Sequence, residues 1–386
     1  MHKLSKELKE FKNQINFSTR IGFLFGAGTS CALGIPNLDK LTAEVEKKIK
    51  AEYKPSLDKI KKHLSNIKNS SKNIEEILNQ LRLIRQITNE SKDVKFLDID
   101  GETAKLFDKD ICDNIYTIIK TDEEKVDISN IVKFFLWYNW LNRDFTKEIF
   151  TTNYDLVIEK CLEFQSIPYF DGFIGSYEPF FLPESIESTN SLEMPPIEWI
   201  RLWKLHGSLG WFWKKDTERI IRLGKVDDKS LNEDEVVIYP SREKYVTSRK
   251  QPFISYFDRL KNYLRYGDLH FIVAGFSFGD QHINEILFDA LRQNNKLQIS
   301  TFLFSEESFN NVKDLATSYL NINVYSPNKA IIRGKIDEYD LTDLEEVDKP
   351  FVIETKKELL LGDFIKLIEF IVLNSGQKEK IESYKK

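Results

Sequence analysis

Four short segments of this sequence hold residue types that could act on a phosphate-bearing ligand. The first is the loop of Gly26, Ala27, Gly28, Thr29 and Ser30. This loop follows the apolar run IGFLF at 21–25, which predicts a strand buried on both faces. Glycines let a backbone approach a pyrophosphate, and the start of the next helix offers unpaired N–H groups. A tight turn between a strand and a helix would use the same glycines without a ligand, so this alternative stays open.

Two further segments carry side chains that catalysis would need. Asn153 lies in FTTNYD, where an expected strand ends, and ligands bind beyond the carboxyl ends of strands in open parallel sheets. His206 lies in LWKLHGSLGW, and histidine is the natural general base near neutral pH. Considered singly, Asn153 is better explained as a helix cap, and His206 as a structural histidine among aromatic residues.

The fourth segment is a second glycine turn, VAGFSFGDQHIN at 273–284. Gly275, Ser277 and Gly279 follow an expected buried strand, so they could hold a second phosphate or a ribose. Asp280 is expected to cap the helix that begins there, which would need no ligand.

Strand and helix patterns alternate around these segments, which predicts an α/β fold with a Rossmann-like parallel sheet. Between about 45 and 145 the chain is rich in Lys, Glu, Asn and Ile with helical periodicity, so we expect a large helical insertion. The region from 331 is acidic and then helical in GDFIKLIEFIVLN, which predicts a C-terminal helical tail that could serve assembly. The expected division is therefore a core of 1–44 and 146–330, an insertion of 45–145 and an extension of 331–386.

Composition excludes several classes of protein. The 386 residues carry a net charge of -5, which gives no general attraction to nucleic acid or to an anionic membrane. Cys31, Cys112 and Cys161 are far apart and form no C-x-x-C pair, so we expect no metal site and a reducing cytoplasm. The first residues lack the apolar segment of a signal peptide, and no apolar run approaches the roughly 18 residues that span a bilayer.

Together, the four segments resemble the motifs of the sirtuin family, in order and in spacing. GAGTSCALGIP resembles the signature Gly-Ala-Gly-x-Ser-x-x-x-Gly-Ile-Pro, and TTNYD resembles Thr-Gln-Asn-x-Asp. KLHGS resembles the Leu-His-Gly that carries the catalytic histidine, and GFSF stands where sirtuins have Gly-Thr-Ser. The resemblance covers about residues 15–325, with the helical insertion outside the motifs. The likeness is greatest to bacterial sirtuin-like proteins of anti-phage defence.

In sirtuins the ligand is NAD+, which is consumed as a substrate. The resemblance implies that Asn153 orders the ribose and the attacking water, that Asp155 holds the nicotinamide carboxamide, and that His206 accepts a proton. It also implies a set of residues that contact the pyrophosphate and the adenosine ribose: Gly26, Ala27, Gly28, Thr29, Ser30, Gly275 and Ser277. Ser305, at the end of the expected strand TFLFS, is a weaker candidate for the adenosine side.

The sequence departs from the family at several positions. Protein-deacylating sirtuins carry a zinc module with two C-x-x-C pairs, which this chain cannot build. The family's Asp-Phe-Arg is replaced by Asn37-Leu38-Asp39, and the Gln of the Asn motif is Thr152. Without an acyl-lysine groove, water is the simplest acceptor. We therefore expect an NAD+ glycohydrolase that releases nicotinamide and ADP-ribose and needs no metal.

The family's biology implies abortive infection through NAD+ depletion in the cytoplasm. Such an activity needs an off state, so we expect a homo-oligomer and, as in some relatives, a separately encoded HerA-type ATPase. The chain has no G-x-x-x-x-G-K-[ST] loop of its own. Two alternatives stay open. One is a catalytically silent regulatory module that binds NAD+ or ADP-ribose, and the other is a protein deacylase or ADP-ribosyltransferase.

Overall fold

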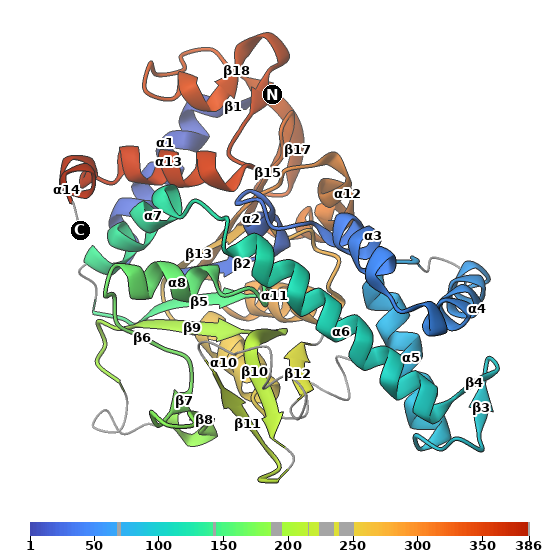
Figure 1. The fold of residues 1–386 in the computed structure, drawn as a ribbon. Coiled ribbons are helices and arrows are strands. Elements are labelled where there is room, and N and C mark those ends of the chain that lie inside the picture. The colour runs from blue at the N-terminus through green and yellow to red at the C-terminus, as the bar shows by residue number, and fades with distance from the viewer. Residues whose placement is uncertain are drawn as a thin grey trace.

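A mixed sheet forms the centre of the molecule (Figure 1). The computed structural model describes residues 1–67, 71–141, 144–186, 195–214, 216–223, 235–238 and 251–384. In spatial order the sheet contains β1 (His2–Lys3), β17 (Lys335–Asp340), β16 (Lys329–Ile332), β15 (Ile322–Tyr325), β14 (Leu297–Phe302), β13 (Leu269–Ala274), β2 (Ile21–Phe25), β5 (Lys147–Thr151), β9 (Ile200–Lys204) and β6 (Tyr169–Phe170). From β15 to β6 all neighbouring strands are parallel.

The central strands are buried on both faces, as the continuous apolar sequence of β2 predicts for that strand. Every residue of β2, β5 and β13 is buried. Successive side chains point to opposite faces, so Phe23 and Phe25 join one hydrophobic cluster and Leu24 joins the other. The first cluster holds the apolar faces of α1 (Leu4–Phe17), α7 (Ser129–Trp140), α8 (Val157–Phe164) and α13 (Phe364–Asn374). The second holds those of α10 (Phe253–Arg265), α11 (Gln281–Gln293) and α12 (Glu306–Ala316).

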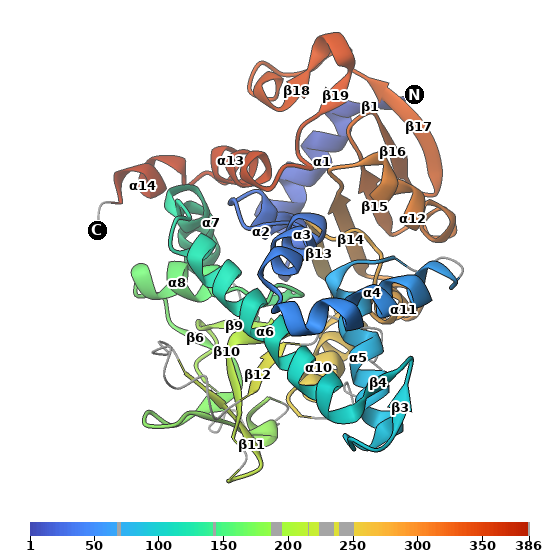
Figure 2. The same ribbon diagram turned by 45° about the vertical axis from the view of Figure 1, so that its right-hand side comes forward.

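Helices dominate the segment between β2 and β5, and Figure 2 shows α3 to α6 grouped beside the sheet. The elements are α2 (Ala27–Cys31), α3 (Leu38–Lys48), η1 (Ala51–Tyr53), α4 (Lys54–Ser65), α5 (Ile74–Thr88), β3 (Lys95–Phe96), β4 (Ile99–Asp100) and α6 (Gly101–Glu123), followed by α7. The Asn73 side chain caps α5 by accepting from the Glu76 N–H at 3.0 Å. The α/β fold with a parallel sheet and a large helical insertion is confirmed.

A smaller antiparallel sheet continues from β9. It contains β12 (Glu235–Ile238), β10 (Gly207–Lys214), β11 (Arg219–Arg222), β8 (Phe180–Phe181) and β7 (Phe173–Ile174), with η2 (Pro183–Ser185) nearby in the chain. Only Leu205 and His206 separate β9 from β10. This places His206 at the junction of the two sheets.

The C-terminal region contains the predicted helical tail, α13 and α14 (Lys378–Ser383), but also strands that the sequence did not predict. β16 and β17 extend the main sheet in the antiparallel sense, and β1 pairs in parallel with β17. Between them and α13 lie η4 (Lys349–Phe351), β18 (Val352–Ile353), η5 (Glu354–Lys356) and β19 (Glu358–Leu359). Within the described part of the chain, no helix combines the length and the apolar character that a bilayer crossing requires.

Candidate functional site

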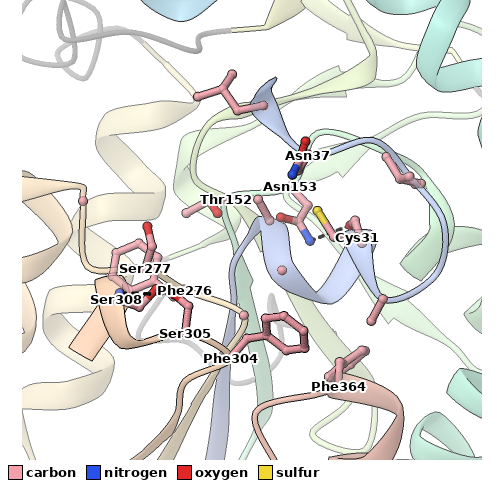
Figure 3. A pocket seen from close by; sticks show the side chains of 18 of the residues that line it. Cys31, Asn37, Thr152, Asn153, Phe276, Ser277, Phe304, Ser305, Ser308 and Phe364 are labelled. Atoms are coloured by element: carbon pink, nitrogen blue, oxygen red, sulfur yellow. Dashed lines mark hydrogen bonds between the residues drawn. The ribbon is translucent and has the colours of Figure 1, made fainter. Parts of the chain in front are cut away.

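A cavity of about 880 Å³ opens where the parallel strands β2, β5, β13 and β14 end (Figure 3). This volume lies within the range of ligand pockets, and the carboxyl ends of strands are where open α/β sheets bind ligands. Residues from all four segments line it. The predicted site residues among them are Ala27, Gly28, Ser30, Asn153, Asp155, His206, Gly275, Ser277 and Ser305. Two predicted residues, Gly26 and Thr29, are not among the residues of the wall.

The two glycine turns pack directly against each other, backbone to backbone. A Cβ on Gly26 would lie 2.5 Å from the Gly275 carbonyl oxygen, and a Cβ on Gly28 would lie 2.8 Å from the Gly275 Cα. Gly275 has a φ of +65°, and its own Cβ would meet the Thr29 nitrogen at 2.4 Å. These three positions therefore need glycine for the close approach alone.

Several backbone amides that were predicted to hold a pyrophosphate already have protein acceptors. Gly26 N donates to the Ala274 carbonyl at 2.9 Å, Gly28 N to the Gly275 carbonyl at 2.8 Å, and Thr29 N to the Gly26 carbonyl at 3.0 Å. The Thr29 hydroxyl also donates to the Gly26 carbonyl, at 2.9 Å. Gly26 and Thr29 therefore support the loop from behind, while Ala27, Gly28 and Ser30 face the cavity.

Asn153, Ser30 and Asp155 form one buried hydrogen-bond chain. Asn153 Nδ2 donates to Ser30 Oγ at 2.8 Å and to Thr29 Oγ1 at 2.9 Å. The Ser30 hydroxyl in turn donates to Asp155 Oδ2 at 2.6 Å. The chain joins α2 to the end of β5, so it fixes the orientation of the two motif side chains that face the cavity.

Asn153 is not a helix cap, although that was the favoured explanation of this residue taken singly. Helix α8 has Leu156 as its N-cap residue, and Asp155 Oδ1 accepts from the Val157 N–H at 3.2 Å. The Thr151 hydroxyl accepts from Asn153 N at 3.0 Å and donates to the Phe25 carbonyl, also at 3.0 Å. These contacts hold Asn153 directly beyond the carboxyl end of β5.

A buried charged group supports the turn that follows Asp155. Lys204 Nζ donates to the Asp155 carbonyl oxygen and to Glu159 Oε1, the latter at 2.7 Å. Glu123, the last residue of α6, accepts from the Leu156 N–H. Burial, and to a smaller extent the charge of Asp155, raise the pKa of Glu123 to about 8. No sequence signal connects Glu123, at the end of an insertion helix, with the site.

His206 contacts Asp280 at the far side of the cavity. His206 Nε2 lies 2.9 Å from Asp280 Oδ2, and the histidine side chain is 15% exposed. Asp280 also caps α11, because its Oδ1 accepts from the N–H groups of His282 and Ile283 at 3.0 and 3.4 Å. The predicted cap is confirmed, but sequence reasoning missed the histidine contact.

Ser277 and Ser305 belong to a polar group at another part of the wall, shown with Ser308 in Figure 3. Ser305 caps α12 by accepting from the Ser308 N–H at 3.3 Å, and Asn311 Nδ2 donates to the Ser277 carbonyl at 3.0 Å. Phe304 lies next to this group in the wall and is 73% exposed. An exposed ring in a cavity wall can stack on a flat ligand group.

The C-terminal region supplies a part of the wall that no motif indicated. Gly362, Asp363 and Phe364 line the cavity. A Cβ on Gly362 would lie 2.2 Å from the Leu303 carbonyl oxygen, so this segment is pressed against the end of β14. The Phe364 ring packs edge-on against Phe25 with centroids 5.1 Å apart. Asp363 precedes the apolar run of α13, which is a recognisable pattern for a helix cap. That pattern could not show that the capping residue lies in the cavity wall.

The helical insertion also reaches the cavity, through Glu75 and Ile119. The wall residues that the structure describes include several carboxylates and no lysine or arginine: Asp39, Glu75, Asp155, Asp280, Glu307 and Asp363. Such a wall gives the cavity a negative potential, which favours a cationic group. In the described ranges, no cluster of three or more His, Cys, Asp or Glu side chains is arranged to hold a metal ion.

Comparison with known proteins assigns part of the chain to a known type of domain. Residues 147–325 match the family model of a SIR2-like domain. This part of the chain is sirtuin-like. The matched region begins at the first residue of β5 and contains Asn153, Asp155 and His206. The glycine loop at 26–30 lies outside the matched region. No curated protein matches the chain.

Several solved structures of Sir2 proteins are similar over most of their length. A Sir2 homolog–NAD complex shares 12% identity with a TM-score of 0.47 and covers 99% of this chain and 98% of its own. A mutant Sir2 homologue with 2'-O-acetyl ADP-ribose shares 11% identity, with a TM-score of 0.43 and coverages of 98% and 98%. Sir2Tm bound to a propionylated peptide shares 12%, with a TM-score of 0.38 and coverages of 79% and 90%.

Proposed function

We propose that this protein is an NAD+ glycohydrolase, which cleaves NAD+ into nicotinamide and ADP-ribose. One observation carries the proposal: Asn153, Asp155 and His206, from separate motifs, line a single cavity beside the glycine loop. The sirtuin-like character of residues 147–325 supports NAD+ as the ligand. A cavity of about 880 Å³ at the carboxyl ends of parallel strands is a suitable place for a dinucleotide.

The nicotinamide–ribose bond would break through an oxocarbenium-like transition state, similar to that of glycosidases. The pyridinium leaves as neutral nicotinamide, so it needs no proton. Fixed geometry around the ribose therefore matters more than a strong acid. The hydrogen-bond chain from Asn153 through Ser30 to Asp155 provides that rigidity.

Three polar side chains of the site would have roles in this reaction. Asn153 would order the ribose and the attacking water. His206 would take the proton from that water or from a ribose hydroxyl, which contributes about 10²- to 10⁴-fold in typical enzymes. Asp155 would accept hydrogen bonds from the nicotinamide carboxamide, and its charge would favour the cationic transition state.

The dinucleotide would extend from this catalytic end toward the polar group around Ser305. Ala27, Gly28 and Ser30 would line its pyrophosphate, and Gly275 and Ser277 would contact the phosphate and the adenosine ribose. We assign catalysis and binding to residues 1–44 and 146–330, with 45–145 as an insertion and 331–386 as an extension. The reaction needs no metal.

The resemblance to bacterial defence proteins supports a biological role for this activity. We propose that NAD+ depletion in the cytoplasm acts in abortive infection and stops the host before phage mature. The protein would act as a homo-oligomer with a separately encoded HerA-type ATPase as a possible partner. A neighbouring gene that encodes nothing of this kind would count against that partner.

The decisive experiment measures nicotinamide release from NAD+ by the purified protein, alone and with the neighbouring gene product. Asn153→Ala and His206→Ala should each lower the rate by at least about 100-fold. Asn114→Ala and His63→Ala change the same residue types on α6 and α4, outside the cavity wall, and should keep the wild-type rate. Tight NAD+ binding without release under every condition would instead indicate a regulatory binding module.

A second outcome would favour a different reaction. If radiolabel from NAD+ appears on a protein and free ADP-ribose does not, the acceptor is a side chain and the protein is an ADP-ribosyltransferase. The dispersed cysteines, which cannot form the zinc module of deacylating sirtuins, argue against the deacylase alternative.

A further inference from the structure

Asp280 uses its two carboxylate oxygens for two different tasks. Oδ1 accepts from the N–H groups of His282 and Ile283 and so caps α11. Oδ2 lies 2.9 Å from Nε2 of His206, in the cavity wall. Helix capping requires one oxygen, so the second contact has no part in capping.

The contact determines which nitrogen of His206 carries the proton. An ionised carboxylate only accepts hydrogen bonds, so Nε2 must be the donor. In the neutral ring the lone pair is then on Nδ1, which becomes the atom that can accept a proton. A neighbouring carboxylate also stabilises the imidazolium that forms when it does. The positive end of the α11 dipole favours the ionised form of Asp280.

The surroundings hold Asp280 in this position. Helix α11 is anchored by Ile283 and Leu287, which are fully buried in the second hydrophobic cluster. Asn284 Nδ2 donates to the Phe278 carbonyl at 2.7 Å and so closes the loop that precedes the helix. On the other side, Leu205 N donates to the Thr151 carbonyl at 2.8 Å, which fixes the residue before His206.

We propose that Asp280 is a positioning residue for His206, which holds the ring as the Nε2–H tautomer, in which Nδ1 carries the lone pair. This inference rests on the proposed NAD+ hydrolysis for its catalytic consequence, but the tautomer itself does not depend on any activity. The other carboxylates of the wall include Asp155, beyond β5, and Glu307, on α12.

The test compares Asp280→Asn and Asp280→Ser with the wild type. Asn and Ser both cap helices as well as Asp, so α11 should keep its cap and the melting temperature should hold. Neither side chain carries the charge that fixes the tautomer. We expect kcat for nicotinamide release to fall at least about tenfold in both variants, with KM changed less than about threefold.

Asp100→Asn is the matched control. Asp100 caps α6 by accepting from the Thr103 N–H at 2.8 Å, and it lies outside the cavity wall. This variant should keep the wild-type kcat. If Asp280→Asn and Asp280→Ser both retain the wild-type kcat as well, Asp280 is only a cap and the proposal is wrong.

A spectroscopic measurement separates this proposal from the proposed function. Ring ¹⁵N chemical shifts of the five histidines report their tautomers, and His206→Gln identifies the signals of His206. The wild type should show His206 as the Nε2–H tautomer, and Asp280→Asn should shift the ring toward a mixture. A wild-type ring in the Nδ1–H tautomer would overturn the proposal. A wild type without turnover but with the expected tautomer would refute only the hydrolase.

Discussion

The cavity has two walls of different chemical character. We call Ser30, Asn153, Asp155, His206 and Asp280 the motif wall, and Phe304, Gly362, Asp363 and Phe364 the tail wall. Side chains of the motif wall form two hydrogen-bonded groups, one of Asn153, Ser30 and Asp155 and the other of His206 and Asp280. The tail wall presents two aromatic rings and a glycine that is pressed against the end of β14. The comparison suggests that one wall supplies the reacting groups and the other supplies shape.

The largest effect should come from Phe364→Ala, in the tail wall. Phe364 is 3% exposed and packs on Phe25, directly before the glycine loop. Removing the ring should cost about 3–5 kcal/mol of the free energy of unfolding, because it leaves a cavity in the core. Chemical denaturation followed by tryptophan fluorescence measures this.

Phe164→Ala is the control for that prediction, since Phe164 is 58% exposed on α8 and should contribute little. Asn153→Ala gives the opposite pattern, with turnover lost and stability nearly kept. If Phe364→Ala abolished turnover while stability held, the tail wall would take part in the chemistry and the two walls would not differ as described.

A smaller effect is expected for Phe304→Ala, at the exposed edge of the tail wall. The ring is 73% exposed, so its loss should not change the melting temperature. If it stacks on the adenine of NAD+, removal should weaken binding by of order 1 kcal/mol, about fivefold in Kd, with kcat unchanged. Calorimetric titration of the His206→Ala background with NAD+ measures the affinity without turnover. Equal affinities would show that Phe304 does not touch the ligand.

The smallest effect concerns Glu123, behind the motif wall. Its pKa is raised from an ordinary value of 4.5 to about 8, so the folded protein retains a proton that the unfolded chain loses between these values. This group therefore lowers stability as the pH rises from about 4.5 to 8. Glu123→Gln keeps an oxygen for the Leu156 N–H and removes the titration. We expect a melting temperature at pH 8.5 at least about 2 °C above that of the wild type, and little change near pH 4.5.

Glu124→Gln is the matched control, because Glu124 is the next residue and is exposed. It should leave the melting temperature unchanged at both pH values. The prediction for Glu123 is wrong if Glu123→Gln destabilises the protein at pH 8.5, since that would mean that the ionised carboxylate is favoured in the folded state.

The sequence was sufficient for the parts of the site that depend on strand ends. Asn153 and Asp155 follow a short buried strand, and parallel strands end on the same edge of a sheet, so their meeting with the glycine loop could be predicted. The contact of His206 with Asp280 could not be predicted, because β2 and β5 lie between β9 and β13 in the sheet. In addition, the predicted role of Asp280 as the cap of α11 already accounted for this residue. Only the geometry shows that the second oxygen has another partner.

The C-terminal region contains strand pairings that no sequence pattern predicts. The strand KIDEYD at 335–340 is charged and mostly exposed, so it lacks the apolar pattern that predicts a strand. It is nevertheless paired with β16 and β1 at the edge of the main sheet. No local sequence signal predicts that Gly362 lies against Leu303.

The pairing of β1 with β17 has a consequence for the order in which the protein matures. The amino group of Met1 contacts the Asp337 carboxylate, 336 residues further along, and the wall is complete only at Phe364. Translation at about 5–20 residues per second takes roughly 4–17 s to pass from Asp280, the last residue of the motif wall, to Phe364. During that interval a nascent chain holds the motif residues without an enclosed cavity. A site that needs both walls therefore stays incomplete until the chain has been made as far as Phe364.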